Sequence, residues 1–482
     1  MRRLLIGSML LCGIVVAFGV QFQGRRGPPL ELWHTEALPA EFSAKNSHEI
    51  QNLDDYRQLE QRLFAQLEEK IYADTKTGSG YELVRYSSGS RADPQTRGLN
   101  WNRSFELEAD EPVGGVLLLH GMSDSPYSLR ALGEILNKRR YWVIGPRLPG
   151  HGTAPSGLKS VTWEDMAAVV RLGIKHLSEK IGKKPIHIVG YSTGAPLALD
   201  FTLDALDGKV TPLPDSLILI SPAIGIHPAV GLAGLKDSLS RIPGLGRLAW
   251  VSIQPEFDPY KYNSFTANAG SQVHRITRSV ADRIANLTQA GLLEKHPPVL
   301  IFKSTVDATV STHAVVDRLL NRLGPYGHEL VLFDINRAAA AGPLLVFDPG
   351  LLTNRLMDDR TLPFTLTVVT NENPKSLQVV FRRKDPFSKD MTKTVSLDLA
   401  WPPSVISLSH VALPFPPDDP LYGQRSPDDA DALFLGQMAI KGELGLLRLS
   451  GDWLLRLRHN PFFEFLERRT REWVDMHGDR QQ

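Results

Sequence analysis

The chain has 482 residues and a formal net charge of +1 at pH 7, with 42% hydrophobic and 22% charged residues. This composition is typical of a soluble globular protein and excludes a fibrous or wholly disordered chain. The balanced charge gives no electrostatic basis for binding nucleic acid, so we expect no nucleic-acid partner. The sequence contains no zinc-type Cys/His spacing and no Walker A or Rossmann glycine pattern, and we therefore expect neither a metal nor a cofactor.

The first feature in chain order is an apolar stretch over residues 4–20, which follows Arg2 and Arg3. A positively charged start and an apolar run of about the minimum length for a membrane span are typical of a signal peptide or a membrane anchor, which we place in residues 1–24. Composition does not decide between these two. Either one predicts a body on the non-cytoplasmic side, periplasmic or extracellular, and an anchor also predicts contact with a membrane through this segment. The single cysteine, Cys12, lies within this stretch, so the body has no disulfide.

Residues 25–79 are expected to form a linker and then a helix over residues 53–72, where apolar residues recur at helical spacing. From residue 80 onward, patterns typical of strands and helices alternate. Helices are predicted at residues 128–138, 163–180 and 195–204. Strands are predicted at residues 81–86, 104–108, 115–119, 141–144, 185–189, 216–220, 299–302 and 330–333. Such alternation indicates an α/β domain, here residues 80–482, with a mostly parallel sheet and helices on both faces.

Two long stretches interrupt this alternation. Residues 223–296 are largely helical in pattern, and an insertion at this point would lie above the strand ends, so we predict a helical lid over the site. Its apolar residues, among them Leu245 and Leu248, would either line the site or pack only within the lid. Residues 336–406 have short runs of alternating polarity and are predicted to form an antiparallel β module that extends the sheet or lies beside it. This module would be either a partner-binding surface or added structural mass.

An apolar strand over residues 186–189 runs directly into Gly190-Tyr191-Ser192-Thr193-Gly194, and a helical pattern follows. A tight strand-to-helix turn of the type G-x-S-x-G exposes the hydroxyl of its serine, and the two glycines leave space where neighbouring backbones crowd the bend. The order strand, turn, helix therefore predicts Ser192 as a catalytic nucleophile. The alternative is a structural turn that happens to contain a serine.

Acyl transfer needs two backbone N–H groups directed at the oxygen that becomes negatively charged. One donor is expected from Thr193, directly after the nucleophile. The second is expected from the loop after the strand at residues 115–119, at Met122. His120 in this loop is interpreted as a buried residue that braces the backbone and not as the catalytic base.

In hydrolases with this turn, the acid and then the base follow the serine along the chain. Asp307 is the predicted acid because it stands just beyond the strand at residues 299–302, whereas Asp317 and Asp334 fit this position less well. His410 is the predicted base because it lies in a loop rich in Ser and Pro. Other histidines that follow Asp307, but are less suitable by their position, are His313, His328, His459 and His477.

Four segments resemble those of the bacterial carboxylesterase and monoacylglycerol-lipase group, often called serine aminopeptidase-like hydrolases, which have the α/β-hydrolase fold. They are residues 118–126 (LLHGMSDSP), 146–153 (PRLPGHGT), 162–165 (TWED) and 190–194 (GYSTG). The R-x-P-G-H-G stretch is quite specific for this group, and the similarity extends over residues 114–200. Family members usually carry Met or Gln where this chain has Thr193, and Gly where it has Ala195. Their acid and base also lie closer together in sequence than Asp307 and His410 do.

The resemblance implies hydrolysis of short acyl or lipid-like carboxylic esters through a Ser192–Asp307–His410 triad and an acyl-enzyme intermediate. The same triad would serve a peptidase or a thioesterase, so these alternatives stay open. A non-catalytic binding protein on the same fold is a third alternative, which predicts the loss of a triad member. The expected ligand is a small ester or lipid, and the motifs identify no protein partner.

Overall fold

The computed structural model describes residues 28–225, 240, 246–307, 309–338, 345–424, 433–436 and 456–478. The apolar stretch over residues 4–20, predicted to be a signal peptide or an anchor, lies outside these residues. Among the described helices, none combines the length and the apolar character that a bilayer span requires.

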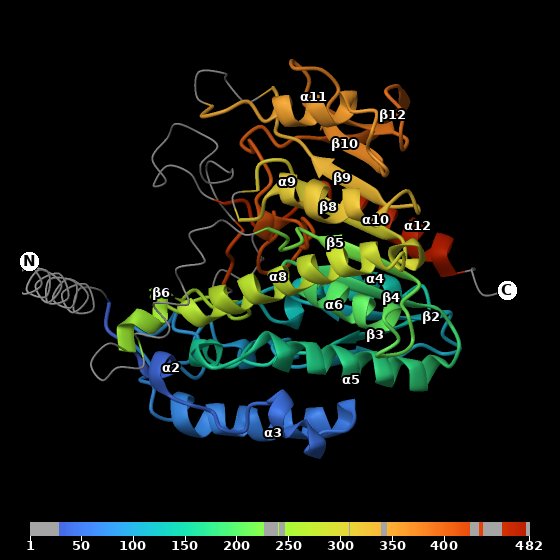
Figure 1. Cartoon of the computed structure of the whole chain (residues 1–482). Helices are drawn as coiled ribbons and strands as arrows, with labels where there is room; N and C mark the ends of the chain where they lie inside the picture. The colour runs from blue at the N-terminus through green and yellow to red at the C-terminus, as the bar shows by residue number, and fades with distance from the viewer. Residues whose placement is uncertain are drawn as a thin grey trace, which may run out of the picture.

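A ten-stranded sheet forms the centre of the described structure, in the order β1-β3-β2-β4-β5-β8-β9-β10-β11-β12 (Figure 1). The strands from β3 to β10 in this order are parallel. At the two edges, β1 is antiparallel to β3, β11 is antiparallel to β10, and β12 is antiparallel to β11. The predicted mostly parallel sheet is confirmed. The strands are β1 (Phe105–Leu107), β2 (Gly114–Leu119), β3 (Tyr141–Gly145), β4 (Ile186–Tyr191), β5 (Ser216–Ile220), β8 (Val299–Ser304), β9 (Glu329–Phe333), β10 (Thr365–Asn371), β11 (Gln378–Lys384) and β12 (Met391–Ala400), with β6 (Trp250–Ser252) and β7 (Phe265–Thr266) in a separate pair.

Helices cover both faces of the sheet, because its parallel strands carry apolar side chains on both sides. In β2, Leu117 and Leu119 belong to one core, which contains residues of α5, α6 and α8. Val116 and Leu118 belong to a second core, which contains residues of α4 and α12. The helices are α2 (Leu32–Thr35), α3 (Leu53–Leu67), α4 (Arg130–Asn137), α5 (Trp163–Ile181), α6 (Gly194–Leu206), α8 (Ala267–Gln289), α9 (Thr312–Val315), α10 (Asn321–Leu323), α11 (Gly350–Asp358) and α12 (Phe463–Gly478).

The N-terminal helix packs on this body. The helix predicted over residues 53–72 is α3, which ends at Leu67 and continues into one π-helical turn. Figure 1 shows α3 (blue) beside α5, and the two helices are in contact. Glu60 of α3 accepts a hydrogen bond from Nε of Arg147 at 2.9 Å, and Arg147 also pairs with Glu41 at 2.9 Å. These buried ion pairs hold the R-x-P-G-H-G stretch, which contains Arg147, against the N-terminal part of the chain.

The predicted lid over residues 223–296 contains one long described helix, α8. The apolar side chains of Ile276, Val280 and Ile284 on α8 are buried in the core that α5 and α6 share. For this helix the lid prediction is wrong, because its apolar face packs against α6 and α5 within that core. Leu245 lies outside the described residues, and Leu248 is half-buried.

Residues 336–406 extend the central sheet at one edge. β10 pairs with β9 in parallel, and β11 and β12 follow as antiparallel strands. The alternating pattern of β10 predicts a half-buried strand, but both of its faces are buried: Leu366 and Val368 lie in one core and Val369 in the other. Helix α11, which the sequence pattern did not predict, contacts β10 (Figure 1). The β-rich stretch is thus continuous with the central sheet.

The strand predicted at residues 81–86 is wrong, because this segment forms a series of turns. Gly80 precedes it with a φ of 87°, a left-handed conformation that bends the chain away from an extended path. Arg85 in this segment is buried and is paired through its side chain and not in a strand ladder: its guanidinium donates to the Asn102 side chain at 3.1 Å. The alternation of polar and apolar residues in this segment therefore does not indicate a strand.

Candidate active site

The site lies at the carboxyl ends of the parallel strands. The chain passes from β2 outward to β3 and then returns to β4 on the other side of β2. In open α/β sheets, ligands bind in the crevice that such a change of direction creates. Ser192 follows β4 and the loop with Met122 follows β2, so both stand at this crevice.

Ser192 occupies a strained turn between β4 and α6. Its φ of 51° lies in the left-handed region, which residues other than glycine seldom adopt. Its backbone N–H donates to the carbonyl oxygen of Ile220 at 2.9 Å, which fixes the turn against β5. A Cβ at Gly190 would lie 2.6 Å from the carbonyl oxygen of Gly194, and a Cβ at Gly194 would overlap the carbonyl oxygen of Leu119. Both glycines are therefore needed for the bend that presents the serine.

The loop after β2 passes directly over this serine. A Cβ at Gly121 would lie only 3.1 Å from the Cβ of Ser192. Among the hydrogen bonds of the described residues, none has the backbone N–H of Met122 or of Thr193 as its donor. Thr193 is the N-cap of α6, and the first N–H groups of a helix have no partner within it and attract negative charge. Both groups are therefore available to a substrate oxygen.

His120 braces the same loop. Its Nδ1 lies 2.9 Å from the carbonyl oxygen of Gly121, and its Nε2 accepts a hydrogen bond from the Leu148 N–H at 3.0 Å. Complete burial, with the nearby imidazole of His151, lowers the pKa of His120 well below its ordinary value. A neutral imidazole with both nitrogens bonded to backbone cannot accept a proton from Ser192. His120 thus braces the loop, as predicted, and is not the base.

Asp307 lies just beyond β8 and its carboxylate is fully buried. Its Oδ1 accepts hydrogen bonds from the backbone N–H groups of Thr309 at 2.8 Å and Val310 at 3.0 Å. Its Oδ2 accepts one from the ammonium of Lys303 at 2.7 Å. Burial alone would raise the pKa of Asp307, but Lys303 and His410 outweigh it and hold the pKa below its ordinary value. The carboxylate is therefore ionised and held in one orientation.

His410 starts a short 3-10 turn (His410–Ala412) and is 6% exposed. Its Nδ1 lies 3.3 Å from Oδ2 of Asp307, although 103 residues separate the two in sequence. Its ring centroid is 5.6 Å from that of Tyr191, the residue before Ser192. The structure therefore brings the predicted acid and base together beside the turn that carries the predicted nucleophile.

The rival residues are used elsewhere. Asp334 accepts hydrogen bonds from Arg337 and from the hydroxyl of Thr370. His328 precedes β9, and its Nδ1 accepts a hydrogen bond from the N–H of Val299 at 3.1 Å. That contact lies at the amino ends of β8 and β9, opposite to the edge with Ser192. Of the remaining candidates, Asp317 and His313 are exposed, His459 lies 3.1 Å from the carbonyl oxygen of Tyr422, and His477 belongs to α12.

Sequence reasoning missed Lys303. A signal for it was present, because a lysine within a buried strand, four residues before the predicted acid, needs a counter-charge. A second missed contact is the ion pair of Lys261 with Asp124, at 2.7 Å. It links the residues just before β7 to the loop after β2, and no motif pointed to it.

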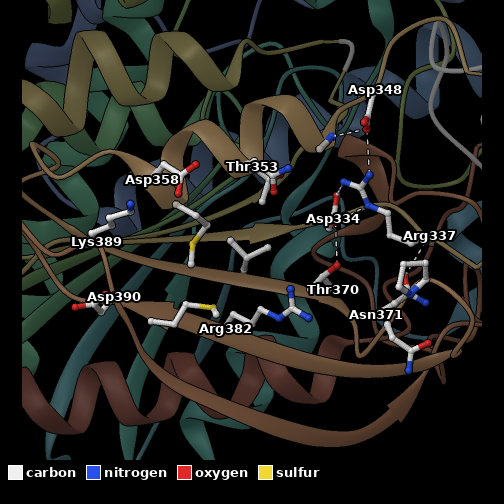
Figure 2. Close-up of a pocket in the computed structure, with 17 residues that line it drawn as sticks. Asp334, Arg337, Asp348, Thr353, Asp358, Thr370, Asn371, Arg382, Lys389 and Asp390 are labelled. Carbon is white, nitrogen blue, oxygen red and sulfur yellow. Dashed lines mark hydrogen bonds and ion pairs between the residues drawn. The ribbon is translucent and has the colours of Figure 1, made fainter.

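A hollow of about 550 Å³ lies away from these residues, between α11 and the β10–β11 hairpin (Figure 2). Figure 2 shows the guanidinium of Arg337 between the carboxylates of Asp334 and Asp348, with distances of 3.0 Å to each. The charged groups at this end of the hollow thus bind one another. Neither Ser192 nor His410 lines it. We therefore place the candidate active site at the carboxyl ends of β2, β4 and β8.

Comparison with known proteins gives a family match over this part of the chain and several partial relatives. A model of the α/β hydrolase family matches residues 116–348. A thermostable monoacylglycerol lipase of Bacillus sp. (strain H-257) is 40% identical over 88 residues, 18% of this chain and 34% of that protein. The magnesium-chelatase 30 kDa subunit of Rhodobacter capsulatus is 33% identical over 138 residues, 26% of this chain and 39% of that protein. A carboxylesterase of Bacillus subtilis (strain 168) is 36% identical over 84 residues, 17% of this chain and 34% of that protein.

These matches span only about a third of the length of the relatives. Among solved structures, the monoacylglycerol lipase of Paleococcus ferrophilus is 20% identical with a TM-score of 0.37, and the match covers 48% of this chain and 88% of that one. The matched family model includes the turn at Ser192, the loop at Met122 and Asp307. Residues 116–348 therefore match the α/β-hydrolase family, and the sheet and helices described above have the corresponding fold.

Proposed function

We propose that this protein is a serine hydrolase that cleaves carboxylic esters of lipid-like or short acyl kind. The observation that carries the proposal is the grouping of Ser192 in its strained turn, two unpaired backbone N–H groups beside it, and the His410–Asp307 pair at the same sheet edge. The names of the monoacylglycerol lipase and the carboxylesterase among its relatives support an ester as the substrate.

In the proposed reaction, the Ser192 hydroxyl attacks the ester carbonyl while His410 takes its proton through Nε2. The carbonyl oxygen becomes negative and is stabilised by the N–H groups of Met122 and Thr193. His410 then gives the proton to the leaving alcohol, and an acyl-enzyme remains on Ser192. Water, deprotonated by His410, releases the acid. Throughout, the Asp307 carboxylate accepts from Nδ1–H and stabilises the imidazolium.

A substrate panel tests the class of bond that is cleaved. We expect kcat/KM for p-nitrophenyl esters and monoacylglycerols to be at least about tenfold above that for matched acyl-thioesters and aminoacyl amides. An enzyme discriminates between substrates by how strongly it binds their transition states, and a difference of about 1.4 kcal/mol in that binding is a factor of ten. The measurement is kcat/KM for each substrate with the same acyl group. Preference for the thioester or the amide would replace the ester proposal with a thioesterase or a peptidase. Absence of labelling by a fluorophosphonate probe would indicate a binding protein on the same fold.

We also propose that the body lies on the non-cytoplasmic side of a membrane, because the apolar residues 4–20 follow two arginines. Fusions of reporters after residue 60 test this. Alkaline phosphatase is expected to be active in such a fusion, whereas a fluorescent protein that matures only in the cytoplasm is expected to stay dark. The reverse pattern would show that the body is cytoplasmic.

A further inference from the structure

Lys303, near the end of β8, is the unusual feature of the site. Its side chain has no exposed surface, and its ammonium lies 2.7 Å from Oδ2 of Asp307. It also donates to the carbonyl oxygen of Val310 at 2.7 Å. An ammonium group this deeply buried is costly unless a carboxylate and further acceptors surround it. The predicted acid of the triad is that carboxylate, so the lysine and the triad depend on the same group.

The two hydrogen-bond donors compete for one oxygen. Oδ1 of Asp307 is occupied by two backbone N–H groups, and Oδ2 receives both the ammonium of Lys303 at 2.7 Å and Nδ1 of His410 at 3.3 Å. The shorter contact is the one to the lysine. Much of the negative charge that would otherwise stabilise a protonated His410 is therefore balanced by a permanent positive charge.

We propose that Lys303 is a positioning residue of the triad, which orients the Asp307 carboxylate and offsets part of the negative charge that this carboxylate presents to His410. The charged or titratable groups in contact here include the Asp307 carboxylate beside His410, the Lys303 ammonium beside Asp307, and the ring of Tyr191 beside His410. Asp307 favours the imidazolium and Lys303 opposes it. The proposal rests on the serine hydrolase function above and deepens it.

The test is the pH dependence of the rate at which a fluorophosphonate probe labels Ser192. This rate reports proton removal by His410 and does not depend on the natural substrate. In the unaltered protein, we expect the rate to fall on acidification as the base becomes protonated, and the midpoint of this fall is the reference for the variants. In Lys303→Met, which removes the charge with little change in volume, we expect the midpoint to move upward by about one pH unit, because a nearby positive charge no longer opposes the imidazolium.

Lys384→Met is the matched control. Lys384 is equally buried, on β11, and its ammonium donates to the carbonyl oxygens of Leu356 and Asp359 and to no carboxylate. This variant is expected to lose stability but to keep the midpoint of the unaltered protein. Lys303→Arg, which retains the charge, is expected to restore the lower midpoint. A purely structural lysine would leave the midpoint of Lys303→Met unchanged.

An unchanged midpoint in folded Lys303→Met would overturn the proposal. If that variant does not fold, Lys303→Gln takes its place, because it also removes the charge but keeps a hydrogen-bond donor, and an unchanged midpoint in that variant overturns the proposal in the same way. A failure of the underlying function looks different: Ser192 would then not be labelled at any pH in the unaltered protein. Ester specificity is likewise separate, since a thioesterase or peptidase would show the same labelling.

Discussion

Replacement of Ser192 by Ala is expected to lower ester turnover by about 10⁴-fold or more while the protein stays folded. The loss is large because the covalent route disappears, and only the residual effect of the oxyanion hole and of substrate binding remains. The fold is expected to survive because the serine contributes backbone hydrogen bonds, to Ile220 and from Ala223, that an alanine also makes. Removal of the Ser192 hydroxyl leaves the Cβ in place, so the turn with its φ of 51° and the flanking Gly190 and Gly194 need not rearrange.

Thr193→Ala provides the matched control for this variant. Thr193 is the next residue and is almost fully buried, but its proposed contribution is its backbone N–H. We expect its kcat/KM to stay within a few-fold of the unaltered value, since the donor to the oxyanion is retained. Both variants are measured for ester turnover and for thermal unfolding. Ester turnover near the unaltered level in folded Ser192→Ala would show that Ser192 is not the nucleophile.

The turn and the loop of the site were predictable from sequence because each is determined by residues close together in the chain. Gly190 and Gly194 are required by contacts with neighbouring backbone, and Gly121 by the close approach of its loop to Ser192. A motif therefore contains most of the information that fixes this geometry. The mostly parallel sheet followed in the same way from apolar runs of strand length separated by helices, whereas the order of its strands did not.

Contacts between distant segments were less accessible. The stretch over residues 223–296 was predicted to be largely helical, and α8 lies within it. Helical periodicity does not say which surface a helix covers, and the apolar face of α8 packs with α5 and α6. Chain order suggested His410, whereas its 3.3 Å approach to Asp307 depends on a chain path of 103 residues through four further strands. The role of Lys303 was not predicted, because it depends on which carboxylate its ammonium pairs with in the folded protein.

Replacement of His410 by Ala is expected to lower ester turnover as strongly as loss of the serine, by about 10⁴-fold or more, because the members of a triad act as one unit. The measurement is kcat/KM for a p-nitrophenyl ester, with thermal unfolding as a check on the fold. His328→Ala is the control: His328 is also buried, but it accepts the Val299 N–H at the opposite end of the strands. That variant is expected to lose stability, by roughly 1–3 kcal/mol, and to retain turnover once folded.

His410 gives a cleaner test of the triad than Asp307 does. When His410 is removed, the buried Asp307 carboxylate still has the ammonium of Lys303 and two backbone N–H groups as partners, so no buried charge is left alone. When Asp307 is replaced by Asn, the Lys303 ammonium loses its counter-charge, and breaking a buried ion pair from one side typically costs about 3–5 kcal/mol. Asp307→Asn is therefore expected to lower both stability and turnover, whereas His410→Ala lowers turnover alone. An active His410→Ala enzyme together with an inactive, folded His328→Ala enzyme would assign the base to His328.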